Sequence, residues 1–186
     1  MPLNTSLLIQ TMSDTVPPPR TMFILMGLPG SGKSTFSEGL PPKYFKIFCQ
    51  DKAPACVGNK RRYLEGRLIE YLSGGGFRTH IVIDRCDFNE SQRATWIKIA
   101  QRFKLMVVFI YFKKNVEECR ESIRARLSSG EKHPSITDEE KMEAALGFMS
   151  KNWQDLTPSE KKYPQFVISS HEESDEWVQR LAKNAA

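Results

Sequence analysis

The segment Gly27–Ser34 limits the folds open to this chain, because it fits the pattern G-x-x-x-x-G-K-[ST]. The apolar residues Phe23–Met26 come directly before it, and the motif requires a strand before it and a helix after it. In such a loop the backbone N–H groups point at phosphate oxygens, and glycines let the backbone approach without a clashing Cβ. The helix that begins near Lys33 adds partial positive charge. The segment therefore predicts a nucleotide phosphate-binding loop.

The motif also assigns roles to its residues. Lys33 would act on the β- and γ-phosphates of ATP as a catalytic residue, and the Ser34 hydroxyl would ligate Mg²⁺. A Gly-rich turn without a ligand would leave the Lys-Ser-Thr sequence at its end unexplained. We therefore predict ATP and Mg²⁺ as cofactors. The expected nucleotide-binding residues of the loop are Leu28, Pro29, Gly30, Ser31, Gly32, Lys33, Ser34 and Thr35.

Composition is compatible with one soluble domain. A chain of 186 residues can bury a full core, and 40% hydrophobic with 26% charged residues is ordinary for a globular protein. Lys and Arg outnumber Asp and Glu by 27 to 22, which suits a polyanionic partner but is also common among ATP-binding proteins. The four cysteines form neither Cys-x-x-Cys pairs nor a metal-ligand pattern, which favours reduced thiols in an intracellular protein.

No targeting or membrane segment is expected. No apolar run is long enough to span a bilayer, so we predict a soluble protein without a membrane partner. The first twenty residues lack the two regions of a signal peptide, and they end in the extended, Pro-rich segment Val16–Arg20. We expect a disordered N-terminal tail at residues 1–20 and a single domain at 21–186. The sequence leaves the oligomeric state and the compartment, nucleus or cytoplasm, open.

Strand-like and helix-like segments alternate from residue 21 onward, which is typical of a parallel sheet covered on both faces. Capping signals at Asn89, Asn115, Thr137 and Ser170 mark the starts of helices. We predict an α/β fold with a five-stranded parallel sheet, helices on both faces and a lid after the fourth strand. The predicted strands are 21–26, 44–49, 79–83, 105–112 and 165–169.

Two acidic residues follow predicted strands, at the end where open α/β sheets bind ligands. Asp51 follows the second strand and could accept a proton from a substrate hydroxyl, or it could form a turn. Asp84 ends the apolar run Ile81–Ile83, as in a Walker B strand, and could hold Mg²⁺ or its water, or cap a helix. We predict Asp51 as a substrate-contacting catalytic residue, and Asp84 together with Ser34 as the metal site.

Phosphoryl transfer also requires positive charge over the γ-phosphate, and three arginines follow the fourth predicted strand. Arg120 and Arg124 are four residues apart and share a helical face, whereas Arg126 points away from both. Arg120 and Arg124 could therefore bind the nucleotide. A solvated face of ion pairs with Glu117 and Glu121 explains the same pattern about equally well.

Two further basic groups have alternative interpretations. Arg85 and Arg93 flank the loop after the third strand and could contact an acceptor phosphate, although Arg93 could equally lie on a helix surface. The cluster Lys60–Arg62 with Arg67 fits a solvated helix face, or a surface that binds a polyanion. We keep Arg85 and Arg93 as predicted substrate-binding residues.

These motifs together resemble those of polynucleotide 5′-hydroxyl kinases, and in particular the kinase-like domain found beside aprataxin-type modules. The resemblance covers about residues 22–170, and it rests on four features. The phosphate loop is generic to many NTPases, whereas Asp84–Arg93 is fairly specific. The four features are the phosphate loop, Gln50-Asp51, the segment Ile83–Arg93, and the arginine spacing followed by His133-Pro134.

The resemblance implies an ATP- and Mg²⁺-dependent kinase that phosphorylates the 5′-hydroxyl end of a polynucleotide, as in DNA repair or RNA processing. It implies that Asp51 is the general base and Arg124 the lid arginine at the γ-phosphate, with Asp84 and Arg93 near the phosphate loop and the acceptor. The family often has an arginine a few residues after the base, where this chain has Ala53–Ala55. Two alternatives stay open: a kinase of a small hydroxylated metabolite, and a nucleotide-binding module that catalyses no transfer.

Overall fold

The computed structural model describes residues 20–75, 79–131 and 133–185, so the predicted tail lies outside them except for Arg20. Five strands form one sheet in the order β2-β3-β1-β4-β5, and every neighbouring pair is parallel. The predicted five-stranded parallel α/β fold is therefore confirmed. The strands are β1 (Thr21–Met26), β2 (Phe45–Cys49), β3 (His80–Asp84), β4 (Met106–Phe112) and β5 (Gln165–Ile168).

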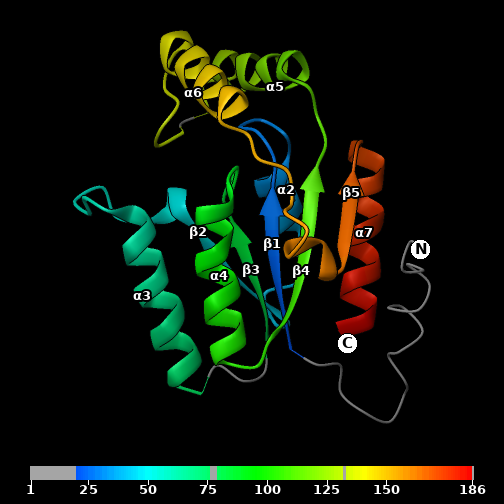
Figure 1. Cartoon of the computed structure of the whole chain (residues 1–186). Coiled ribbons are helices and arrows are strands. Elements are labelled where there is room, and N and C mark those ends of the chain that lie inside the picture. Colours follow the sequence, from blue (N-terminus) through cyan, green and yellow to red (C-terminus); the bar gives the residue numbers. More distant parts are fainter. Residues whose placement is uncertain (1–19, 76–78, 132, 186) are drawn as a thin grey trace.

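Helices cover both faces of the sheet and one of its ends (Figure 1). One face carries α2 (Lys33–Gly39) and α7 (His171–Ala185), and the other carries α3 (Lys60–Ser73) and α4 (Glu90–Arg102). Two helices, α5 (Val116–Ser128) and α6 (Glu139–Lys151), lie across the carboxyl ends of the strands and are called the lid (Figure 1). The short 3-10 helices are η1 (Gln50–Lys52) and η2 (Glu160–Lys162). Within the described ranges, none of the helices is long and apolar enough to cross a membrane.

The central strand, β1, is apolar because helices cover both of its faces. Successive side chains of a strand point to opposite faces of the sheet. Met22, Ile24 and Met26 therefore pack with α3 and α4, whereas Phe23 and Leu25 pack with α2 and α7. All five side chains are at most 6% exposed. A parallel strand covered on both faces needs apolar residues at every position, and β1 has them.

The start of each lid helix is capped by a side chain. Asn115 and Glu118 form the predicted capping box at α5, with N···O distances of 2.9 and 2.8 Å. At α6 the expected cap Thr137 is wrong: Asp138 accepts the N–H of Lys141 at 2.8 Å and caps the helix. A carboxylate is a good N-cap because it both accepts the free N–H and interacts favourably with the helix dipole.

Candidate active site

A cleft of about 650 Å³ lies where the phosphate loop, the ends of β2 and β3 and the lid meet. Parallel strands all present their carboxyl ends at one edge of the sheet, so ligand-binding side chains after different strands converge there. Asp51 and Asp84 therefore line the same cleft as Lys33, although they are far apart in the sequence. The wall of the cleft includes Lys33, Ser34, Asp51, Asp84, Arg85 and Arg126.

The phosphate loop packs directly against α5 of the lid. Gly30 has a φ of 81°, and a Cβ there would lie 2.6 Å from the Cys119 carbonyl oxygen and 2.8 Å from Ile123 Cγ1. Only glycine fits this position, because both the left-handed backbone and the close approach of α5 exclude a side chain. Leu28 joins Cys119, Ile123 and Met142 in an apolar cluster between the loop and the lid. The lid is thus held on the loop itself.

Lys33 places an ammonium group against the loop backbone. Its Nζ donates hydrogen bonds to the carbonyl oxygens of Gly27 (3.0 Å) and Leu28 (2.8 Å) and to the hydroxyl of Ser31 (3.2 Å). The residue is only 7% exposed. The positive charge is therefore fixed inside the loop, at the position where a phosphate group would need it.

The residues around Asp84 fit a Mg²⁺ site. Asp84 is the last residue of β3, is 5% exposed, and accepts a hydrogen bond from the Ser37 hydroxyl of α2 at 3.1 Å. Ser34, one turn earlier on α2, lines the cleft together with Asp84. Mg²⁺ prefers oxygen ligands and is usually held by one or two side chains plus substrate phosphates. A hydroxyl and a carboxylate beside a phosphate loop match that requirement.

Asp51 lies in η1 directly after β2, and two side chains of the segment 133–136 contact it. Its Oδ1 accepts a hydrogen bond from the Ser135 hydroxyl at 3.1 Å, and its Oδ2 lies 3.5 Å from His133 Nε2. His133 holds the pKa of Asp51 below its ordinary value, and Ser135 and Lys60 also lower it. Partial burial raises the pKa, but by less than these contacts lower it. The carboxylate is therefore ionised and already accepts a hydroxyl hydrogen bond, as a general base must.

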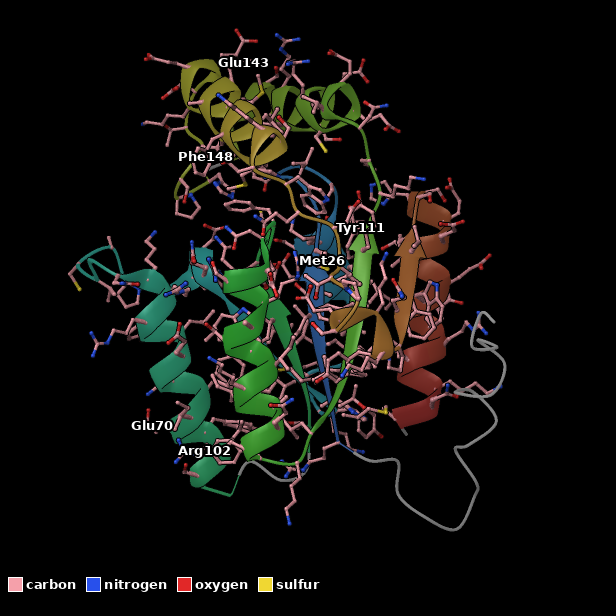
Figure 2. The ribbon with its side chains drawn as sticks, viewed as in Figure 1. Met26, Glu70, Arg102, Tyr111, Glu143 and Phe148 are labelled. Atoms are coloured by element: carbon pink, nitrogen blue, oxygen red, sulfur yellow. The ribbon has the colours of Figure 1, made fainter. Side chains whose placement is uncertain are left out.

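Arg120 and Arg124, the two arginines predicted to bind the nucleotide, contact glutamates instead. Arg120 donates to Glu143 at 2.6 and 3.0 Å and pairs with Glu117, while Arg124 donates to Glu139 at 2.6 Å. Figure 2 shows Glu143 on the outer side of α6, away from the sheet. These contacts join the two lid helices to each other, and neither arginine lines the cleft. The prediction that Arg120 and Arg124 bind the nucleotide is therefore corrected: both form ion pairs, Arg120 with Glu117 as in the alternative, and Arg124 with Glu139 in place of Glu121.

Arg126 is the lid arginine that lines the cleft. Ile123 packs on the phosphate loop, and the residue three positions later lies on the same side of the helix. Within the described part of the chain, the Nε and Nη2 atoms of Arg126 are buried without a hydrogen-bond partner. Unpaired buried donors are costly, so an anion bound in the cleft would be stabilised by them. Residue spacing alone could not find Arg126, because the packing of Ile123 on Gly30 decides which face of α5 meets the loop.

A family profile described as an AAA domain matches residues 22–151, which is more than half of the chain. The chain belongs to the AAA domain family. A comparison with curated protein sequences gave no match.

Solved structures show that this AAA domain has the fold of P-loop kinases. A fungal RNA kinase superposes with a TM-score of 0.64 at 18% identity over 89% of this chain and 85% of the other. Kti12 of Chaetomium thermophilum gives a TM-score of 0.59 at 13% identity over 89% and 99% of the two chains. APS kinase of Mycobacterium tuberculosis gives 0.53 at 16% identity over 90% and 98%. These superpositions establish that the chain shares the fold of these proteins.

Arg93 of the AAA domain does not contact the cleft, which corrects its predicted substrate role. The side chain is completely buried, and its Nε and Nη2 each donate to Glu160 at 2.8 Å. Its other N–H groups donate to the carbonyl oxygens of Asp87, Gln154 and Asp155 at 2.8 to 3.2 Å. All five donors of the guanidinium are thus used inside the fold. Arg93 connects α4 to the segment that follows the lid.

This buried pair yields a stability prediction. Removing one partner of a buried ion pair leaves an uncompensated charge, so Arg93→Ala should lower the free energy of unfolding by about 3–5 kcal/mol. Lys98→Ala, an exposed change on the same helix, should alter it by less than about 0.5 kcal/mol. Urea denaturation of the two variants measures both values. An Arg93→Ala protein that is as stable as the wild type but binds acceptor weakly would restore the substrate role.

Arg85, in contrast, does lie at the cleft. Its side chain is 9% exposed and its Nη1 is 3.5 Å from Asp87 Oδ1. Its guanidinium lies over the Trp96 ring at 5.8 Å, and its Nε is buried without a partner in the described residues. A second unpaired guanidinium donor is thus available on the β3 side of the cleft. Arg85 remains a candidate for binding an acceptor phosphate.

Asp87, next to this arginine, predicts a pH dependence of stability. Burial raises the pKa of Asp87 from its ordinary value of 3.8 to about 6. An acid with a raised folded pKa favours folding when protonated, so its contribution falls as pH rises from about 4 to about 6. Asp87→Asn cannot ionise. Relative to the wild type, its free energy of unfolding should therefore increase by about 1–3 kcal/mol between pH 4 and pH 7 in urea denaturation. A pH-independent difference would contradict the raised pKa.

Proposed function

We propose that this AAA domain transfers the γ-phosphate of ATP to the 5′-hydroxyl end of a polynucleotide. The observation that carries the proposal is the meeting of Asp51, Lys33 and Arg126 in one cleft. ATP supplies the phosphoryl group, and Mg²⁺ neutralises charge on its phosphates. The loop amides and Lys33 hold the phosphates, Ser34 and Asp84 hold the metal, Asp51 accepts the hydroxyl proton, and the acceptor binds beside Arg85.

The donor side of the cleft is built for a charged phosphoryl group. Catalysis of this transfer consists mainly of positioning and of positive charge aimed at the phosphoryl oxygens. Lys33 supplies charge from the loop and Arg126 supplies it from the lid, where two of its nitrogen atoms have no hydrogen-bond partner among residues 20–75, 79–131 and 133–185. A cleft that only held a nucleotide without transfer would have no need of an ionised Asp51 that accepts a hydroxyl hydrogen bond in the same cleft.

The acceptor side favours a nucleic acid over a small polar metabolite. Phe148 is 59% exposed and points from α6 toward the sheet (Figure 2), and the centre of its ring lies 5.8 Å from that of Phe88 in the cleft wall, in an edge-to-face arrangement. An aromatic face beside a basic cleft is suited to stacking a nucleobase, which contributes about 1–3 kcal/mol per base. Lys60, at the start of α3, lowers the pKa of Asp51 through its charge, and it adds positive charge near the proposed acceptor site. The similar fungal RNA kinase is consistent with this substrate class.

The proposal is tested with ATP labelled at its γ-phosphate. The protein is incubated with 5′-hydroxyl RNA, 5′-hydroxyl DNA and a pool of hydroxylated metabolites, and 5′-phosphorylated oligonucleotides of the same sequences are the control. Label should enter only the 5′-hydroxyl oligonucleotides, and acceptor affinity should fall steeply between 50 and 200 mM salt. Label in a small metabolite, with no salt dependence, would favour a metabolite kinase. ATP binding without any transfer would favour a binding module.

A further inference from the structure

The segment 133–136, which lies between the two lid helices in the sequence, contacts Asp51, and its own backbone is fixed by hydrogen bonds and packing. His133 Nδ1 accepts the backbone N–H groups of Ser135 (3.1 Å) and Ile136 (3.0 Å). Ile136 is 5% exposed and packs in the apolar cluster with Ile123 and the phosphate loop residue Leu28. The imidazole is thus oriented by the backbone, and the backbone is anchored in the lid.

This arrangement decides which imidazole nitrogen carries the proton. A nitrogen that accepts two N–H groups has no hydrogen of its own, so a neutral His133 must be protonated at Nε2. That Nε2 lies 3.5 Å from Asp51 Oδ2. The N–H at Nε2 is therefore on the side of the imidazole that faces Asp51 Oδ2, and the other carboxylate oxygen accepts a hydrogen bond from the Ser135 hydroxyl at 3.1 Å.

The Ser135 hydroxyl donates to Asp51 in the way that the hydroxyl of a phosphoryl acceptor would. A general base must receive a hydrogen bond from the hydroxyl that it deprotonates, at about 2.6–3.2 Å. Ser135 makes this contact from within the same cleft as Lys33 and Arg126. An acceptor hydroxyl approaching Asp51 Oδ1 would need the place that the serine hydroxyl occupies.

We propose that His133 is a positioning residue that orients the Asp51 carboxylate, and that the Ser135 hydroxyl holds the place of the acceptor hydroxyl until an acceptor displaces it. This inference rests on the proposed function. It assigns opposite effects to two neighbouring residues of one segment. Loss of His133 misplaces the base, whereas loss of the Ser135 hydroxyl removes a competitor.

Kinetics of acceptor phosphorylation separate these effects from general damage to the lid. His133→Ala should lower kcat about 10- to 100-fold with little change in the KM for ATP, because a misplaced catalytic group costs about this much. His133→Gln keeps an amide N–H at a similar reach and should restore part of that loss. Ser135→Ala should lower the acceptor KM about 2- to 5-fold, the effect of one hydrogen bond. Ser128→Ala, an exposed lid serine, is the matched control and should change neither constant.

Equal kcat for wild type and His133→Ala, or a raised acceptor KM in Ser135→Ala, would overturn the proposal. A second measurement does not depend on transfer. Long-range ¹H–¹⁵N spectra of the full chain should show His133 protonated at Nε2, with a changed Nε2 signal in Asp51→Asn. Protonation at Nδ1, or an unchanged signal, would overturn the lid contact. Absence of transfer in the wild type together with the expected spectra would instead reject the proposed function alone.

Discussion

Arg126→Ala is expected to lower kcat for phosphoryl transfer by about 10³-fold, the lower range for an arginine that stabilises charge on a transferring phosphoryl group. The reason is the position of its guanidinium, which lines the cleft with two buried nitrogens lacking partners among the described residues. Arg126→Lys should recover only part of the rate, because a lysine cannot present the planar pair of donors. The measurement is the rate of label transfer at saturating ATP and acceptor.

Arg124→Ala is the matched control for this prediction. It removes an arginine from the same helix, but one that is half exposed and paired with Glu139 on α6. Such surface pairs contribute about 0–1 kcal/mol, so kcat should change by less than about threefold. A large loss of kcat in Arg124→Ala with a small one in Arg126→Ala would mean that the lid rearranges when it binds nucleotide, and that the arginine chosen from spacing was correct.

Asp51→Asn is expected to lower kcat about 10²- to 10⁴-fold, the usual contribution of a general base. The asparagine keeps the shape of the side chain but cannot accept the proton of the acceptor hydroxyl. ATP affinity should be unchanged, because the phosphate loop and Lys33 lie on separate elements from η1. Transfer assays give kcat, and calorimetry with a non-hydrolysable ATP analogue gives the affinity.

The control for this prediction is Asp175→Asn, an exposed aspartate on α7 that should behave as the wild type. Wild-type kcat in Asp51→Asn would remove this residue as the base. A loss of ATP affinity equal to the loss of rate would instead make Asp51 part of the nucleotide site. The two outcomes are separable because calorimetry requires no acceptor.

Most of the fold could be predicted because its signals are local. The apolar run Phe23–Met26, the phosphate loop after it and the helix caps at Asn89 and Asn115 each depend on residues within a few positions. Burial on both faces makes parallel strands apolar throughout, which distinguishes them from the amphipathic helices between them. The predicted strands therefore agree with the observed ones to within one residue at each end.

The convergence of the two strand-end carboxylates could also be predicted, because parallel strands expose the same end at one edge of the sheet. Asp51 and Asp84 line the cleft beside Lys33 as expected. The side chains that contact Asp51 and Arg93 could not be predicted, because they are distant in the sequence. Ser135 contacts Asp51 across 84 positions of sequence, and Arg93 pairs with Glu160 across 67.

From the sequence alone follow the phosphate loop, the alternation of strands and helices, and the two acids at the strand ends. Tertiary structure decided the strand order, the buried role of Arg93 and the choice of Arg126 over Arg120 and Arg124. The physical reason is that a periodic pattern predicts which residues share a helix face, but it does not predict which other element of the fold that face packs against. For α5 the neighbour is the phosphate loop, and the absence of a side chain at Gly30 lets Ile123 lie against it.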